Sequence, residues 1–253
     1  MEYGCGQCMP CRINKGREWT ARLLLERNEH RDSCFVTLTI DEVHLRGRDL
    51  CKRSLQLFLK RLRERVGPIR YFAVGEYGDV SWRPHYHLII FGLSPVQEEE
   101  VKKAWPYGFV QVGTADVGAV KYITGYVLKK MTRETKALNG RVPEFALMSR
   151  RPGIGHGVVS RIHASVIAAP SAVNSLSLKT VRISGKVYPI GRYLHEKTLE
   201  RCGVSEDERV IERTRTAIEV ADRKSVYPSV KAYEVQRKSR VEQQNYNRRG
   251  RSL

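Results

Sequence analysis

The stretch Arg83-Pro84-His85-Tyr86-His87-Leu88-Ile89-Ile90-Phe91-Gly92 organises the predicted fold. It is rich in β-branched and aromatic residues and ends at a glycine, which predicts a β-strand. Because side chains alternate along a strand, His85 and His87 project from one face. Two imidazoles on a rigid backbone supply half of a metal site. The alternative is one core histidine and one surface histidine, so the pair needs support from elsewhere in the chain.

The composition is that of a strongly basic globular protein. The 253 residues are 41% apolar, which is enough for a sizeable core, and they carry a formal net charge of +18. This excess predicts a polyanionic partner, most simply nucleic acid. An anionic membrane surface is the alternative, but we find no amphipathic helix with a large exposed apolar face, no membrane-length apolar run and no signal-peptide core. We therefore expect a soluble, intracellular protein with no membrane partner.

Three of the six cysteines form a C-x2-C-x2-C cluster near the N-terminus, made of Cys5, Cys8 and Cys11. An intracellular chain keeps its thiols reduced, so a disulfide framework is not expected. With a fourth ligand from elsewhere, the cluster could hold a structural Zn2+ or an iron–sulfur cluster. The alternative is a plain turn with unpaired thiols.

The predicted elements follow the order β-α-β-β-α-β, with a further helix appended. This is an α+β fold of the split βαβ type, with helices on one face of an antiparallel sheet and the other face free for a site. The same scaffold underlies RNA-recognition folds, so topology alone does not predict an enzyme. The elements are a helix at 12–29, a strand at 34–40, a helix capped by Asp49 that ends near 66, strands at 69–76 and 83–92, a helix capped by Ser94, a strand at 109–113, and a helix at 116–131 capped by Asp116.

Three segments are predicted. Residues 1–33 form the cysteine-rich turn and the N-terminal helix, and residues 34–165 form the central α+β domain. Residues 166–253 form a mostly helical basic extension, with a short hairpin at 181–190, helices from about 205 and a basic tail at 237–251.

A carboxylate is predicted to join the histidine pair. Glu76 ends the strand before the histidine strand, and eight residues separate it from His85. If the two strands pair as a hairpin, Glu76 lies beside His85. Two histidines and one carboxylate with open positions suit a catalytic divalent cation. The alternative for Glu76 alone is a surface acid at a turn.

The helix at 116–131 supplies a second set of reactive groups. Tyr122 and Tyr126 are four residues apart and share a face, together with Lys129. This face lies opposite an apolar stripe. A tyrosine has an ordinary pKa of about 10 and attacks a phosphate well only when a cation polarises that phosphate. These groups therefore favour phosphodiester cleavage through a phosphotyrosine intermediate. The apolar stripe consists of Val117, Val120, Ile123, Val127, Leu128 and Met131.

Several motifs carry a resemblance to a known family. His85-Tyr86-His87 resembles the HUH motif of rolling-circle replication initiators, and Tyr122-x3-Tyr126-x2-Lys129 resembles the motif of their two-tyrosine class. The segment 35–39, Phe-Val-Thr-Leu-Thr, looks like their first motif. Cys5-Gly6-Gln7-Cys8, Gly75-Glu76-Tyr77-Gly78, Arg83 to His87 and Arg151-Pro152-Gly153-Ile154-Gly155 are similar to replication initiators of microviruses, the gokushovirus-type phages with small circular single-stranded DNA.

The resemblance implies a Mg2+- or Mn2+-dependent nickase and strand transferase that acts on single-stranded and replicative-form DNA at the phage origin. It implies action in the cytoplasm of the bacterial host, with the host DNA polymerase. The sequence holds no G-x4-G-K-[ST] phosphate loop, so we expect a host helicase as well. The implied roles are metal ligands for Glu76, His85 and His87, nucleophiles for Tyr122 and Tyr126, a group near the scissile phosphate for Lys129, and DNA contacts for Arg83, Lys121, Lys130, Arg150 and Arg151.

Two other functions fit part of the pattern. A non-catalytic nucleic-acid-binding module with the RNA-recognition fold would explain the charge and the topology, but not the convergence of the histidines with Glu76. Such modules place stacking aromatics on their central strands. A plasmid or transposon HUH nuclease would use nearly the same chemistry, more often with one tyrosine.

Overall fold

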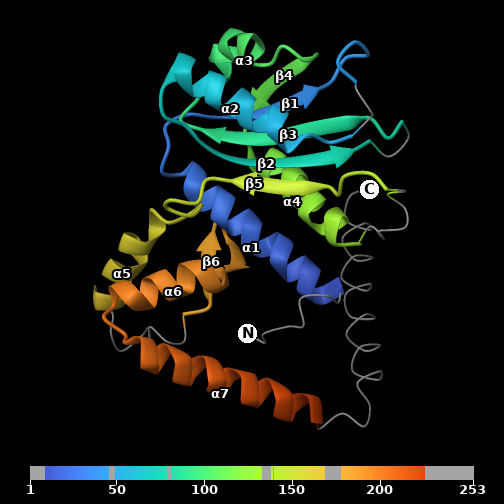
Figure 1. Cartoon of the computed structure of the whole chain (residues 1–253). Helices are drawn as coiled ribbons and strands as arrows, with labels where there is room; N and C mark the ends of the chain where they lie inside the picture. Colours follow the sequence, from blue (N-terminus) through green and yellow to red (C-terminus); the bar gives the residue numbers. More distant parts are fainter. Residues whose placement is uncertain are drawn as a thin grey trace, which may run out of the picture. The chain divides into compact units, whose positions relative to one another are not determined.

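The computed structural model describes residues 9–45, 49–78, 81–132, 138, 140–168 and 178–225 (Figure 1). The helices are α1 Met9–Arg27, α2 Lys52–Val66, the short 3-10 helix η1 Pro95–Gln97, α3 Glu98–Ala104, α4 Val117–Thr132, α5 Val158–Ala168, α6 Gly191–Arg201 and α7 Glu206–Ser225. The strands are β1 Ser33–Thr39, β2 Arg70–Tyr77, β3 Pro84–Phe91, β4 Val110–Thr114, β5 Phe145–Met148, β6 Thr180–Ile183 and β7 Lys186–Pro189.

The main sheet has the strand order β4-β1-β3-β2-β5, and every neighbouring pair is antiparallel. Its first four strands, with α2 and α3, reproduce the predicted β-α-β-β-α-β order. The predicted α+β class is therefore confirmed. The sequence did not predict β5, which extends the sheet beyond β2.

The sheet separates two packing layers. On one face, α2 buries Leu55, Phe58 and Leu62 against the apolar side chains of the central strands, and α3 adds Val101 and Ala104. The apolar residues of α2 recur at the helical period, so one stripe faces the sheet and the charged residues remain outside. The second face also receives helices, because α1 and α4 both pack against it (Figure 1). This face is therefore not free along its whole length, as the sequence had led us to expect.

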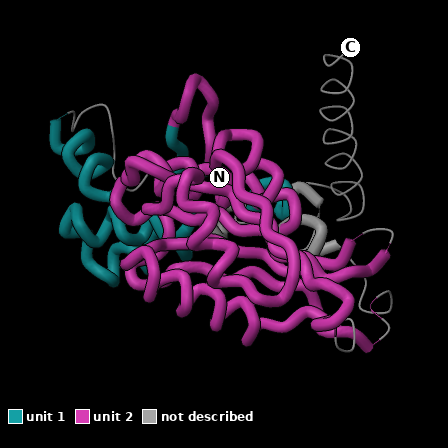
Figure 2. The backbone as a smooth tube through the Cα atoms, turned by 90° about the horizontal axis from the view of Figure 1, so that it is seen from above, with its two compact units in different colours: residues 1–15, 159–181, 189–253 teal, residues 16–158, 182–188 magenta. Residues whose placement is uncertain are grey.

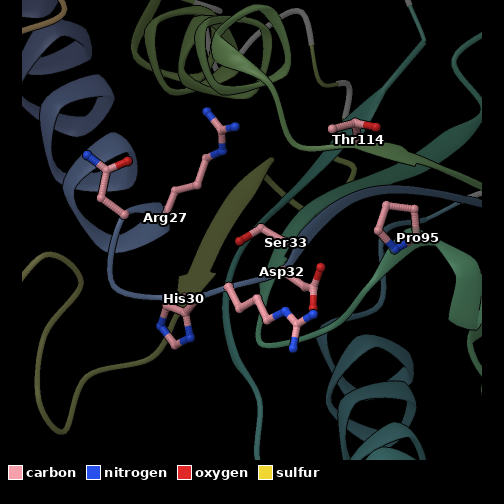
Figure 3. Close-up of a pocket in the computed structure, with 8 residues that line it drawn as sticks. Arg27, His30, Asp32, Ser33, Pro95 and Thr114 are labelled. Carbon is pink, nitrogen blue, oxygen red and sulfur yellow. The ribbon is translucent and has the colours of Figure 1, made fainter.

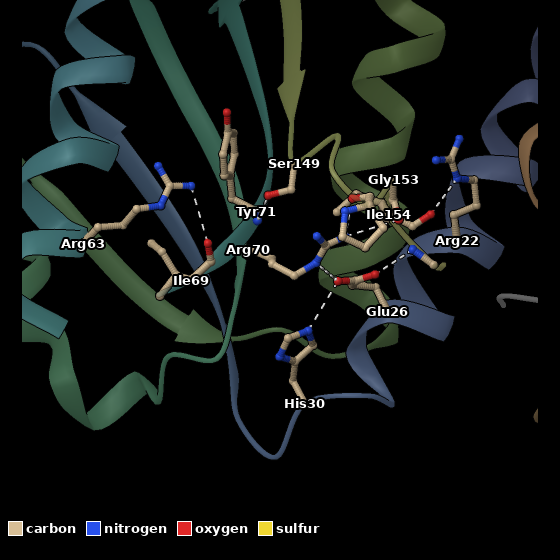
Figure 4. A network of polar contacts seen from close by, with 12 residues as sticks. Arg22, Glu26, His30, Arg63, Ile69, Arg70, Tyr71, Ser149, Gly153 and Ile154 are labelled. Atoms are coloured by element: carbon tan, nitrogen blue, oxygen red, sulfur yellow. Dashed lines mark hydrogen bonds and ion pairs between the residues drawn. The ribbon is translucent and has the colours of Figure 1, made fainter. Parts of the chain in front are cut away.

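Helix α1 is tied to the second face by a polar network (Figure 4). The buried Glu26 carboxylate accepts hydrogen bonds from the Arg70 guanidinium of β2 and, at 2.6 Å, from the Gly155 N–H. Arg70 also donates to the Pro152 and Gly153 carbonyls, at 3.0 and 3.2 Å. The segment 151–155, singled out from sequence as a family motif, is thus a loop clamped between α1 and β2.

The predicted caps had different outcomes. Asp116 caps α4, because its Oδ1 accepts the Ala119 N–H at 2.7 Å. Asp49 does not cap α2, whose N-cap is Cys51. The Asp49 carboxylate instead accepts the Tyr77 hydroxyl at 3.0 Å and the Val142 N–H at 3.3 Å, two partners that are distant in sequence. Tertiary hydrogen bonds therefore take this carboxylate away from the helix.

The chain divides into two compact units (Figure 2). The unit of 16–158 and 182–188 contains the main sheet, and the other comprises 1–15, 159–181 and 189–253. The predicted hairpin is confirmed as β6 and β7, joined through Ser184 and Gly185, both at positive φ. The predicted helix from about 205 is confirmed as α7, whereas α5 and α6 were not predicted. The tail at 237–251 lies outside the described residues, and no described helix is long and apolar enough to cross a membrane.

Candidate active site

Strand pairing brings the three predicted metal ligands together. In the β2–β3 register Glu76 lies opposite His85, and Val74 lies opposite His87. Paired residues share a face, and so do residues two apart on one strand. The side chains of Glu76, His85 and His87 are therefore on the same face, and the two imidazoles lie nearly parallel with ring centroids 6.5 Å apart.

His87 is the most constrained member of the group. It is 6% exposed, and both ring nitrogens have partners: Nδ1 lies 3.1 Å from the Thr37 hydroxyl of β1, and Nε2 lies 3.0 Å from Glu76 Oε1. Phe35 stacks on the ring with centroids 5.8 Å apart. Buried polar atoms are normally satisfied, and here the partners also fix the ring orientation.

Helix α4 places both predicted nucleophiles over His87. The Tyr126 ring stacks on the imidazole, with centroids 5.0 Å apart and planes 9° from parallel. The Tyr122 ring meets the same imidazole edge-on at 5.4 Å, and the Tyr126 hydroxyl donates a hydrogen bond to the Tyr122 hydroxyl. Val120 and Ile123 are fully buried on the packing side of the helix. The prediction that the tyrosines lie off the apolar face is confirmed, although Val117 of the predicted stripe is 40% exposed.

The two phenols differ in their surroundings. Tyr122 is 50% exposed, whereas Tyr126 is partly buried between His87 and the strands. Burial, the Tyr122 hydroxyl and the negative charge of Glu76 raise the pKa of the Tyr126 phenol above its ordinary value. Tyr126 therefore holds its proton firmly in this arrangement, and Tyr122 is the phenol open to a large substrate.

The donor set suits a divalent cation in its chemistry. His85 Nδ1 lies 2.8 Å from the Arg83 carbonyl and His87 Nδ1 lies near Thr37, so both rings are left with Nε2 as the ligating atom. Adjacent ligands about 2.1 Å from one ion lie about 3 Å apart, close to the observed separation of Glu76 Oε1 and His87 Nε2. Across the described ranges, however, no three His, Cys, Asp or Glu side chains stand as a ready-made metal site. Glu76 and His87 are joined to each other instead.

The remaining predicted site residues lie in several places. Arg83 is bound by the fold, since it donates to the Ile40 carbonyl at 3.0 Å and pairs with Glu42 at 2.6 Å. Lys121 is exposed on α4 beside Tyr122. Two further arginines, Arg150 and Arg151, are exposed at the end of β5 remote from Glu76.

Other predictions fall on parts that the structure does not describe. The side chains of Lys129 and Lys130 lie outside the described residues. The same holds for Cys5 and Cys8, while Cys11 is buried near the start of α1. The structural-metal cluster remains a prediction.

Sequence reasoning missed one acidic residue beside the site. Glu144 is 8% exposed, and its Oε1 accepts the Tyr77 N–H at 3.2 Å. Together with Glu76 and Tyr126 it lines a small cavity between β2, β5 and α4. It directly precedes β5, a four-residue strand without clear alternation, so nothing in the sequence placed it near the histidines. Phe35 and Thr37 were quoted within a motif but not as members of the site.

Comparisons with known proteins bear on this arrangement. Residues 33–131, which include β1 to β4 and most of α4, match the family model of the replication-associated protein ORF2. The chain is 31% identical over 153 residues to replication-associated protein VP4 of Bdellovibrio phage phiMH2K. It is 34% identical over 179 residues to replication-associated protein ORF2 of Spiroplasma virus 4, and 30% identical over 150 residues to replication-associated protein ORF4 of Chlamydia phage 1. The predicted resemblance to microvirus-type replication initiators is confirmed.

These matches are partial on both sides. They cover 51%, 60% and 50% of this chain for the Bdellovibrio, Spiroplasma and Chlamydia phage proteins. The matched part is 49%, 55% and 38% of the respective relatives. No solved structure matches the chain. The matched region is nonetheless the one that carries Glu76, both histidines and both tyrosines.

Proposed function

We propose that this protein initiates rolling-circle DNA replication as a divalent-metal-dependent nickase and strand transferase. The observation that carries the proposal is that both phenol rings contact His87, the histidine that is hydrogen-bonded to Glu76. A purely packing role would not require two tyrosines, two histidines and a carboxylate at one point of the sheet. The named relatives, all replication-associated proteins of phages, support the same role.

The chemistry follows from the groups at this point. The phenol oxygen of one tyrosine bonds to the scissile phosphorus while the bond to the 3′ oxygen breaks, and that oxygen takes up a proton to leave a free 3′ hydroxyl. One phosphate ester is exchanged for another, so the reverse reaction can rejoin the strand. Glu76, His85 and His87 would hold the Mg2+ or Mn2+, which polarises the phosphate and stabilises its developing charge.

The rest of the site would position these groups. Thr37 orients the His87 ring through Nδ1, and the Arg83 carbonyl does the same for His85. The neighbouring tyrosine would be available for a second transfer while the first remains esterified. Lys121 is close enough in sequence to Tyr122 to contact the adjoining DNA backbone, and Lys129 would fill a similar role. The free 3′ end would be extended by host polymerase in the bacterial cytoplasm, with a host helicase unwinding the duplex.

The test is incubation of the protein with single-stranded DNA that contains the phage origin, in the presence of Mn2+. The expected product is a nick with protein joined to the 5′ phosphate, seen as a DNA-labelled band in a denaturing gel. Joint replacement Tyr122→Phe/Tyr126→Phe and the single change His85→Ala should each abolish the band, whereas Tyr107→Phe, a phenol outside the site, should not. Formation of the adduct at the normal rate by the double Phe variant would contradict the mechanism. Activity in excess chelator would remove the metal from it.

A further inference from the structure

A second polar hollow lies on the same unit, away from the tyrosines (Figure 3). It is a cavity of about 420 Å3 at the junction of the last turn of α1, the start of β1, the end of β4 and Pro95. Its polar lining is dominated by Arg27, Asn28, His30, Arg31, Ser33 and Thr114.

The lining is short of protein partners. Within the described part of the chain, neither the Arg27 nor the Arg31 guanidinium has a hydrogen bond or an ion pair. The Ser33 hydroxyl is buried and also lacks a hydrogen-bond partner. A buried polar atom without a partner is uncommon and suggests a ligand or ordered water in its place. Asp32 is the acid among the lining residues, so the two arginines leave the hollow positive.

Two elements lead from this hollow to the candidate active site. Ser33, Phe35 and Thr37 lie on one face of β1, and Thr37 contacts His87, so the hollow lies about 13 Å from the histidines along the strand. The connection into α4 starts at the same place, because the Ala115 N–H donates to the Ser33 carbonyl at 3.4 Å. From there α4 leads past the exposed Lys121 to the tyrosines.

We propose that this hollow, lined by Arg27, Arg31 and Ser33, binds a backbone phosphate of the DNA strand that is cut, a few nucleotides from the scissile phosphate. A guanidinium can contact a phosphate through two parallel N–H bonds, and a hydroxyl adds a third donor. Contacts of this kind set the register of a strand without reading its sequence. The inference rests on the proposed function for its substrate, because it assigns the hollow to the strand that reaches the tyrosines.

The position of the hollow favours a nucleic-acid strand over a free nucleotide. The lining offers cationic and hydroxyl groups but, among the lining residues, neither an aromatic face for a base nor an apolar slot for a sugar. An isolated nucleotide would therefore find a phosphate contact and little else. A strand bound at the tyrosines and in the hollow together gains from both ends.

The test measures DNA affinity separately from cleavage. A fluorescent single-stranded origin oligonucleotide is titrated with protein in excess chelator, and its anisotropy is followed from low to high salt. The variant Arg27→Ala/Arg31→Ala should lower the slope of log affinity against log salt by about 1.4, since each phosphate contact on single-stranded DNA contributes about 0.7. Relative to binding near 1 M salt, this corresponds to about 25-fold weaker binding near 0.1 M salt.

Two matched variants make the result specific. Arg53→Ala/Lys60→Ala removes the same charge from exposed positions of α2, on the other face of the sheet, and should change affinity and slope much less. Arg27→Lys/Arg31→Lys keeps the charge and should retain most of the salt slope while losing part of the affinity. Equal losses for the two Ala pairs would overturn the inference, and so would an unchanged affinity of Arg27→Ala/Arg31→Ala with an unchanged melting curve.

Failure of the inference and failure of the proposed function can be told apart. With Mn2+ and saturating oligonucleotide, Arg27→Ala/Arg31→Ala should form the covalent adduct at nearly the normal rate, because only binding is impaired. A single methylphosphonate linkage moved along the oligonucleotide should weaken wild-type binding at one position near the nick and leave this variant unaffected. If the wild type forms no adduct but keeps the arginine-dependent affinity, the nickase proposal fails and the DNA-binding hollow remains. If the wild type forms the adduct and the arginines have no effect, only the hollow is refuted.

Discussion

At the scale of single residues, His87 connects the sheet to the reactive helix. Its two nitrogens contact Thr37 and Glu76, and its ring faces are occupied by Phe35 and Tyr126. The imidazole has little freedom to rotate, because any rotation would break a hydrogen bond inside a buried site. Metal affinity at such a histidine depends on the group that holds its second nitrogen.

Thr37→Val should therefore weaken metal binding without removing a ligand. Valine keeps the β-branched shape but cannot bond His87 Nδ1, and loss of an outer partner of this kind lowers metal affinity by about 10- to 100-fold. A Mn2+ titration of adduct formation should shift to higher concentration by this factor, with a similar rate at saturation. Thr39→Val, on the same face of β1, is the control. A Mn2+ dependence identical to the wild type would show that Thr37 does not orient the ligand.

The two tyrosines should not be equivalent in the first cleavage. Tyr122 is half exposed, while Tyr126 is packed on His87 and donates its O–H to Tyr122. Tyr122→Phe should strongly reduce the first adduct, since the more accessible phenol is lost. Tyr126→Phe should retain that adduct and lose the second transfer, measured as ligation of a second oligonucleotide. The reverse pattern, with Tyr126→Phe abolishing the first adduct, would contradict this order.

At the scale of elements, the contact of α1 with β2 and the loop 151–155 depends on one carboxylate. Glu26 is 3% exposed; burial alone would raise its pKa, but the Arg70 guanidinium and the Gly155 N–H outweigh burial and lower it below the ordinary value. A carboxyl with a lowered folded-state pKa stabilises the fold above its unfolded pKa, and this contribution is lost as pH falls through the folded value.

Glu26→Gln should reduce the free energy of unfolding at neutral pH by about 3–5 kcal/mol, because Arg70 would lose its buried ionic partner. The difference from the wild type should shrink as pH falls below the ordinary carboxyl range, where the wild-type carboxyl is itself protonated. Urea unfolding followed by tryptophan fluorescence measures it, since Trp19 of α1 packs on Phe72 of β2. Glu64→Gln, in an exposed ion pair with Lys60, should cost less than about 1 kcal/mol. A difference that persists unchanged at low pH would show that charge is not the cause.

The elements that the sequence predicted well are those with strong local patterns. The histidine strand, its hairpin partner and α4 were found from alternation, helical period and the Asp116 cap, and register then placed Glu76 opposite His85. These features depend on neighbours within a few residues, so they can be read locally.

What the sequence did not predict depends on distant partners. Asp49 resembles a helix cap, yet its carboxylate serves Tyr77 and Val142. The short β5 strand owes its existence to pairing with β2, and Glu144 reaches the site only through that pairing. The hollow lined by Arg27 and Ser33 likewise combines residues of four separate elements. No periodicity along the chain marks such combinations.

At the scale of the whole molecule, the net charge of +18 exceeds what two or three active-site contacts need. Several basic residues are already committed within the fold, as Arg70 is to Glu26 and Arg83 to Glu42. The charge that remains available for DNA must come largely from exposed side chains and from sequence beyond the described residues. The last segment, 237–251, carries six Arg or Lys residues against one Glu.

Removal of residues 237–253 should weaken DNA binding without altering the chemistry of the site. If the six basic residues each neutralise one phosphate, the slope of log affinity against log salt should fall by about 4 on single-stranded DNA. Anisotropy titrations of the truncated and complete chains over a range of salt measure this slope. The rate of adduct formation at saturating DNA should stay close to that of the complete chain, because Glu76, both histidines and both tyrosines are retained. A truncated chain with the full salt slope would show that the basic tail does not contact DNA, and the affinity would then have to come from the exposed arginines and lysines of the folded units.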